Sequence, residues 1–177
     1  MPFEIIKMNK ILIIVLIIVS CKRDMQSQIN SGDIFDLCDS TNNCGNELYF
    51  NVSELFFIND KTFCLIDYSD VPYANKNMTG TYRITSDSLF LTFNPMFVII
   101  GIKWEGEPYI SEGETYLKKK SEKISPLSFR IDKCQNNAIM LTNAKVRKFS
   151  YGFKTKEDSK GKMTELLESE EWKELNK

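Results

Sequence analysis

The side chains that decide which chemistry this chain can perform are its five cysteines and the histidines that it lacks. Histidine is the side chain most used for acid–base catalysis near neutral pH, and it is the commonest metal ligand. Its absence excludes Ser-His-Asp and Cys-His mechanisms and any histidine-based zinc site. The cysteines also lack the paired CxxC spacing of a Cys₄ zinc site. We therefore predict a non-enzymatic protein without a cofactor or metal.

The first cysteine, Cys21, ends a segment that is typical of an export signal. Two lysines within residues 7–10 precede an aliphatic run at 11–19. This run is too short to cross a bilayer as a helix, which takes about 20 residues, but it has the length of the apolar part of a secretory signal. The initiator is either Met1 or Met8. The alternative is a buried N-terminal helix or strand that ends in a core cysteine.

The four residues Ile18-Val19-Ser20-Cys21 resemble the lipobox of bacterial lipoproteins, with an aliphatic residue, a small residue and then the cysteine. The resemblance implies that residues 1–20 are removed and that Cys21 carries a diacylglyceryl group and an N-terminal acyl chain such as palmitate. Two or three chains would hold the protein on a membrane, because each buried CH₂ contributes about 0.8 kcal/mol. Lys22 stands where aspartate marks inner-membrane retention in enteric lipoproteins, so the resemblance favours the outer membrane, on its periplasmic or surface face.

The other cysteines are Cys38, Cys44, Cys64 and Cys134. An even number in an exported protein predicts two disulfides, with three possible connectivities. A bridge between Cys38 and Cys44 would close a short polar loop, and one between Cys64 and Cys134 would join distant strands. Four free, partly buried thiols are the alternative.

The charge balance argues against a nucleic-acid partner. The formal net charge is −1, and removal of residues 1–20, which hold Glu4, Lys7 and Lys10, makes it −2. Phosphate binding needs a clustered excess of lysine and arginine. The densest basic stretch, Lys118–Lys120, has acidic neighbours, and we interpret it as a solvated strand end or loop.

The mature chain has the pattern of an all-β domain, in which short apolar runs alternate with turn residues. The turns Asn59-Asp60-Lys61 and Ser86-Asp87-Ser88 each separate two such runs and predict hairpins. Residues 67–77 read as a polar loop. The expected strands are 48–52, 54–58, 62–66, 80–85, 89–93, 97–104, 115–123, 128–134, 138–142 and 146–154. Strands of this spacing are typical of an antiparallel barrel or a β-sandwich.

The stretch 54–93 resembles the small lipocalin-like domains of Gram-negative envelope lipoproteins, in which a Gly-x-Tyr strand (here Gly80-Thr81-Tyr82) leads through a turn to an alternating leucine strand. The segments Phe129-Arg130-Ile131 and Ile139-Met140-Leu141 repeat that rhythm. The resemblance implies a lipocalin-like barrel. A barrel of that kind would bind a small apolar molecule or an envelope partner protein.

The predicted organisation of the mature chain has three parts. Residues 21–45 form the lipidated cysteine, a flexible tether and a cysteine loop, 46–156 form the barrel, and 160–177 form one amphipathic helix. The apolar side of the helix is most simply a docking face on the barrel. The alternative is a protein-interaction or inhibitor module that acts through the barrel rim or this helix.

Three groups of side chains are candidate sites, each with a simpler interpretation. The first group could supply oxygen ligands to calcium, the second is a possible acid–base pair, and the third could line a cavity for an apolar ligand. A solvated loop, two polar loop residues and plain core packing are the respective alternatives. The groups are Asp33, Asp36, Asp39, Asn42 and Glu47; Asp67 and Asp70; and Phe56, Phe57, Phe63, Tyr82, Phe90 and Phe93.

Overall fold

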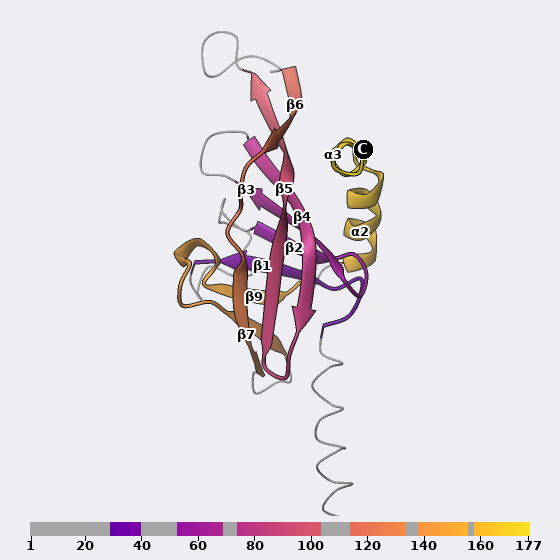
Figure 1. Cartoon of the computed structure of the whole chain (residues 1–177). Coiled ribbons are helices and arrows are strands. Elements are labelled where there is room, and N and C mark those ends of the chain that lie inside the picture. Colours follow the sequence, from indigo (N-terminus) through magenta and orange to yellow (C-terminus); the bar gives the residue numbers. More distant parts are fainter. Residues whose placement is uncertain (1–28, 40–52, 69–73, 104–113, 134–137, 156–157) are drawn as a thin grey trace, which may run out of the picture.

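A computed structural model describes residues 29–39, 53–68, 74–103, 114–133, 138–155 and 158–177 (Figure 1). The strands are β1 (Ile34–Cys38), β2 (Ser53–Phe57), β3 (Thr62–Tyr68), β4 (Ala74–Ile84), β5 (Ser88–Lys103), β6 (Glu114–Ser121), β7 (Leu127–Lys133), β8 (Ile139–Thr142) and β9 (Tyr151–Lys154). A 3₁₀ turn, Arg147–Phe149, precedes β9, and the helices α2 (Ser159–Glu168) and α3 (Glu170–Leu175) end the chain.

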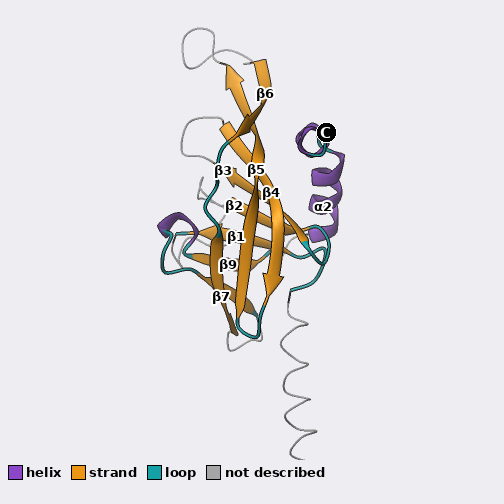
Figure 2. Cartoon of the chain, viewed as in Figure 1, coloured by secondary structure: helices purple, strands orange, loops and turns teal. Residues whose placement is uncertain are grey.

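The strands form a closed antiparallel barrel (Figure 2). Neighbouring strands follow the order β4-β3-β2-β1-β9-β8-β7-β5, and pairing of β4 with β5 closes the ring. Strand β6 lies outside this ring and pairs with the far half of β5. The predicted all-β antiparallel barrel is therefore confirmed, and closure leaves no unpaired edge in the ring.

Strand β5 belongs to the barrel with its first half and leaves it with its second. Residues 88–91 pair with β7, whereas 96–103 pair with β6. Pro95 lies between these two pairings, at the change of partner, and its carbonyl oxygen accepts from the Glu122 N–H. We predicted two separate strands here, 89–93 and 97–104, where the structure has the single strand β5.

The barrel interior is packed with aromatic and aliphatic side chains. Phe57 makes edge-to-face contacts with Phe35 and Tyr82 at centroid distances of 5.8 and 4.8 Å, and Phe63 contacts Phe93 at 5.1 Å. Fully buried leucines from β1, β2, β3, β5 and β8 fill the space around these rings. The core-packing interpretation therefore holds for these members of the aromatic group.

The two remaining aromatic residues of that group, Phe56 and Phe90, lie on the outer face. Phe56 belongs to a second apolar cluster with Leu166 of α2, and Phe90 lies under Arg83, whose guanidinium carbon is 4.1 Å from the ring centroid. Both follow from strand alternation, since their neighbours on either side point inward. The prediction that Phe56 and Phe90 could line a cavity inside the barrel is therefore wrong.

The C-terminal helices cover one side of the barrel (Figure 1). The Asp158 side chain caps α2, and the Ser169 hydroxyl accepts from the Trp172 N–H to start α3. Ser169 therefore breaks the helix that we predicted as one element. The buried Leu166, with Met163 and Trp172, packs on an outer-face cluster of Ile34, Phe56 and Cys64, so the apolar side is a docking face.

Two strand segments were not predicted. Strand β1 lies within the stretch 21–45, which we predicted as tether and cysteine loop, and the polar stretch 67–77 contributes to both β3 and β4. The alternation of β1 is hidden because its outward side chain Ile34 is also apolar, as the docked helix requires. The turn before β1 is fixed by Gly32, whose φ is +90° and whose N–H donates to the Phe57 carbonyl.

The cysteines differ from the predicted pairing. Cys64 is a free, buried thiol between β2 and β4, so the prediction that it forms a disulfide is wrong. Its side chain points to the outer face and packs under α2. Cys38 is disulfide-bonded, with a partner outside the described residues. Cys21, Cys44 and Cys134 also lie outside them, and the connectivity stays a prediction.

Within the described ranges, no helix combines the length and apolar character needed to span a bilayer.

Candidate functional site

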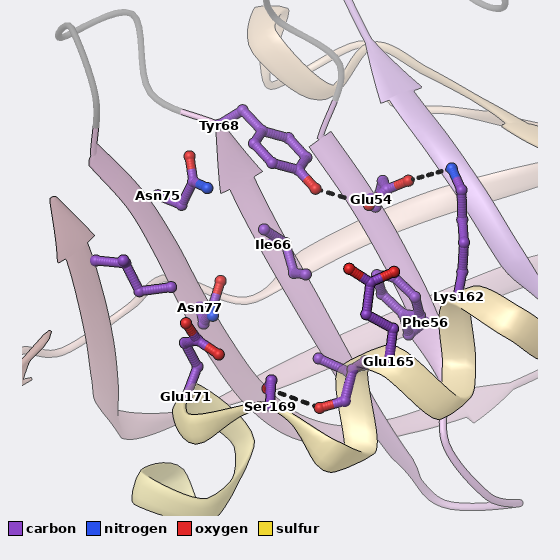
Figure 3. A pocket seen from close by; sticks show the side chains of 12 residues that line it. Glu54, Phe56, Ile66, Tyr68, Asn75, Asn77, Lys162, Glu165, Ser169 and Glu171 are labelled. Carbon is purple, nitrogen blue, oxygen red and sulfur yellow. Dashed lines mark hydrogen bonds and ion pairs between the residues drawn. The ribbon is translucent and has the colours of Figure 1, made fainter. Parts of the chain in front are cut away.

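A groove of about 400 Å³ lies between the helix pair and the outer face of the sheet (Figure 3). Its sheet side is formed by β2, β3, β4 and β5, and its other side by α2 and α3. The lining residues are Glu54, Phe56, Ile66, Tyr68, Asn75, Asn77, Ile100, Lys162, Glu165, Leu166, Ser169 and Glu171.

Strand register brings the sheet residues of the groove together. Glu54 pairs with Ile66 and Ile66 with Asn77, so these three side chains form a row across β2, β3 and β4. Tyr68 pairs with Asn75 and Asn75 with Ile100, which gives a second row two residues along. Directly paired residues share a face of a sheet, so both rows point toward the helices.

Glu54 is the centre of a hydrogen-bonded group in this groove. Its two carboxylate oxygens accept from the Tyr68 hydroxyl at 2.7 Å and from the Lys162 ammonium at 2.8 Å, as Figure 3 shows. The Glu54 side chain is only 14% exposed. A carboxylate this buried is costly unless it is paired, and here it ties α2 to β2 and β3.

The Tyr68 hydroxyl is held in its protonated form. Burial raises the pKa of Tyr68 well above its ordinary range, and the charges of Glu54, Glu165 and Asp36 raise it further. The hydroxyl donates to Glu54. Tyr68 therefore acts as a fixed donor, and it is not suited to act as a base or nucleophile at physiological pH.

Asn77 is the polar side chain in the groove whose hydrogen bonding is incomplete. The residue is 3% exposed, and within the described part of the structure its Oδ1 is a buried acceptor with no hydrogen-bond partner. Leaving such a group unpaired costs about 1–3 kcal/mol. An unpaired buried acceptor that borders a groove can accept a hydrogen bond from a small ligand.

Cys64 lies beside the groove in the cluster under Leu166, and its thiol makes the free energy of unfolding depend on pH in the alkaline range. Burial raises the pKa of the Cys64 thiol to about 12. A raised pKa means that stability is fully present below the unfolded-state value near 9 and is lost as the pH rises toward 12. Each pH unit in that window costs roughly 1.4 kcal/mol.

We therefore expect Cys64→Ala to flatten the alkaline stability profile. Between pH 8 and pH 10.5 the wild-type protein should lose roughly 2 kcal/mol more unfolding free energy than the variant, because the variant has no thiol to ionise on unfolding. Urea unfolding at both pH values measures the difference. All other side chains are the same in the two proteins, so equal losses in the two would contradict the assignment.

The acidic residues predicted as candidate sites are ion-paired or hydrogen-bonded instead. Asp33 pairs with Lys154 at 2.6 Å, Asp36 accepts from the Thr155 hydroxyl at 2.9 Å, and Asp67 pairs with Lys148 at 2.7 Å. No cluster of metal-binding side chains occurs among the residues that the structure places. Asp39 is exposed at the end of the β1 segment, and Asn42, Glu47 and Asp70 lie outside the described residues.

The basic stretch Lys118–Lys120 lies in β6. Lys118 and Lys120 are exposed, in agreement with a solvated strand end, whereas the Lys119 ammonium points the other way and donates to the Glu174 carbonyl at 2.9 Å. Lys119 therefore helps to hold α3 on the sheet.

No family model and no curated protein matches this chain. One solved structure that is similar is a streptavidin-like protein from Bacteroides eggerthii, with a TM-score of 0.49 and 21% sequence identity over 81% of this chain and 91% of that chain. A likeness of this size says nothing of a ligand.

Proposed function

We propose that this chain is a non-enzymatic binding protein of the bacterial cell envelope, anchored by lipid on Cys21, that holds a small ligand in the groove between the helix pair and the barrel. The observation that carries the ligand site is the unpaired Oδ1 of the buried Asn77 in a groove of about 400 Å³. Pockets for small ligands are concave and combine apolar surface with converging polar groups, and both kinds of side chain line this groove.

The groove is a better ligand site than the barrel interior. The rings of Phe35, Phe57 and Phe63 are fully buried and fill the interior, so a ligand there would have to displace core side chains. Displacing packed rings costs several kcal/mol, which binding would have to offset. The groove residues do not belong to the barrel core, and their polar atoms lie on its outer face.

The N-terminal sequence supports the envelope location. The signal-like run 11–19 followed by Ser20-Cys21 fits a lipidated N-terminus. The proposed placement is the outer membrane, with the barrel on its periplasmic or surface side. A role of the terminal helices as a partner-binding module is less favoured, because Leu166, Met163 and Trp172 already pack on the barrel.

A groove-filling variant tests the proposed site. Ile66 lies on the groove side of β3, and Ile66→Trp would place an indole where the ligand is proposed to sit. The full chain, isolated in mild detergent, is incubated with the small-molecule fraction of a bacterial extract, washed and denatured, and the released compounds are identified by mass spectrometry. We expect a compound that the wild type retains and that Ile66→Trp retains at least tenfold less.

The matched control is Thr92→Trp, which adds the same indole at an exposed position of β5 that does not line the groove. It should retain the compound as the wild type does. Equal retention by Ile66→Trp and the wild type, or no retained compound in any of the three proteins, would contradict the proposed function.

A further inference from the structure

The charges that line the groove do not cancel. The Lys162 ammonium is paired with Glu54, which leaves the carboxylates of Glu165 and Glu171. Within the described residues, neither of these two carboxylates has an ion pair. The groove is therefore net negative, and a cation is the charge that it would attract.

The polar atoms of the groove also differ in what they need. The Tyr68 hydroxyl and the Lys162 ammonium already donate to Glu54, and the Ser169 hydroxyl donates to the Leu166 carbonyl at 2.7 Å. The buried Asn77 Oδ1, in contrast, has no donor among the residues that the structure describes. The Asn77 Oδ1 therefore needs an N–H or O–H donor from a ligand, and an ammonium or a guanidinium supplies such a donor together with positive charge.

The positions of these groups agree with one ligand. Figure 3 shows Asn77 of β4 and Glu171 of α3 at one end of the groove and Glu165 nearer to Glu54. Ile66, Ile100 and Leu166 supply apolar surface along the groove. This arrangement suits an alkyl chain that ends in a cationic N–H donor.

We propose that the groove binds a small organic cation with N–H donors, a primary amine or a guanidine, which donates to Asn77 Oδ1 and is balanced by Glu165 and Glu171. This inference rests on the proposed function and names the class of ligand for the same site. The negative charge of the groove would attract any cation, whereas the Asn77 Oδ1 favours cations that carry a hydrogen-bond donor.

Calorimetric titration of the full chain with agmatine tests the inference, since agmatine carries a guanidinium and an ammonium on a short alkyl chain. We expect saturable binding that Asn77→Leu weakens at least tenfold and that Glu165→Gln and Glu171→Gln each weaken several-fold. Glu168→Gln is the matched control, because it removes the same charge from an exposed position of α2 outside the groove, and it should change the affinity less than twofold.

Two further arms separate donor recognition from charge. Tetramethylammonium, a cation without N–H, should bind at least tenfold more weakly than agmatine. Asn77→Leu should unfold at a temperature no lower than the wild type, because it removes an unpaired buried acceptor. A variant that loses agmatine binding together with several degrees of melting temperature would instead indicate a structural role for Asn77 and would overturn the inference.

The outcome also distinguishes this inference from the proposed function. Absence of agmatine binding, while the wild type still retains a compound that Ile66→Trp does not, would overturn the ligand class and leave the groove as the binding site. Agmatine binding that Ile66→Trp, Asn77→Leu and Glu171→Gln all leave unchanged would contradict both.

Discussion

Replacing Gly80 with alanine is expected to lower the free energy of unfolding by about 3 kcal/mol. A β-carbon at this position would lie 2.1 Å from the Thr92 carbonyl oxygen and 2.8 Å from the Phe63 ring. The first is a backbone atom of the neighbouring strand β5, so it cannot rotate away. Gly80 also lies where the register of β4 and β5 shifts, and closure of the barrel depends on that pairing.

Gly101→Ala is the matched control for this prediction. A β-carbon there would meet the ring of Tyr116 at 2.5 Å, but that ring is a side chain of β6, outside the closed barrel, and it can turn away. We expect a loss of about 1 kcal/mol at Gly101. Urea unfolding of both variants gives the comparison. An equal loss of unfolding free energy in the two variants would mean that the close approach of β4 and β5 is not the reason why position 80 requires glycine.

Introducing aspartate at Leu166 is expected to raise the rate of thiol labelling at Cys64 on the order of 100-fold. Leu166 is 5% exposed and packs with Ile34, Phe56 and Cys64, so a carboxylate there would release the helix pair from the barrel. Release uncovers Cys64, which is fully buried in the docked state. Labelling with a maleimide, followed by mass spectrometry of the Cys64 peptide, measures the rate.

The neighbouring Leu167 provides the control, because it is 39% exposed and points away from the barrel. Leu167→Asp should label at the wild-type rate. Circular dichroism of both variants at the same pH checks that the barrel is still folded. Equal labelling of Leu166→Asp and Leu167→Asp would show that the helix pair does not protect Cys64, and the groove would then have no stable second wall.

The barrel could be predicted from the sequence because most of its strands carry a local signal. The two hairpins at Asn59–Lys61 and Ser86–Ser88 have turn residues between alternating runs, and the structure has β2–β3 and β4–β5 there. Strand β1 carried no such signal, since outward-facing Ile34 is apolar. The helix that covers Ile34 comes from the other end of the chain, so local alternation could not account for it.

The groove could not be predicted for a related reason. Its polar residues Glu54, Asn77 and Glu171 are far apart in sequence and meet only through strand register and helix docking. Asn75 and Asn77 also lie in the stretch that we predicted as a polar loop, where asparagine is ordinary. The sequence held one usable signal. Two asparagines stand two residues apart beside an apolar run, and residues at this spacing lie on the same face of a strand.

Methyl NMR of isoleucine-labelled protein titrated with agmatine shows whether the ligand binds in the groove outside the barrel. Ile66 and Ile100 line the groove, whereas Ile84 and Ile131 pack against the barrel core. We expect saturable shifts of the Ile66 and Ile100 methyl signals, with those of Ile84 and Ile131 unchanged. Shifts confined to Ile84 and Ile131 would contradict it and place the ligand inside the barrel.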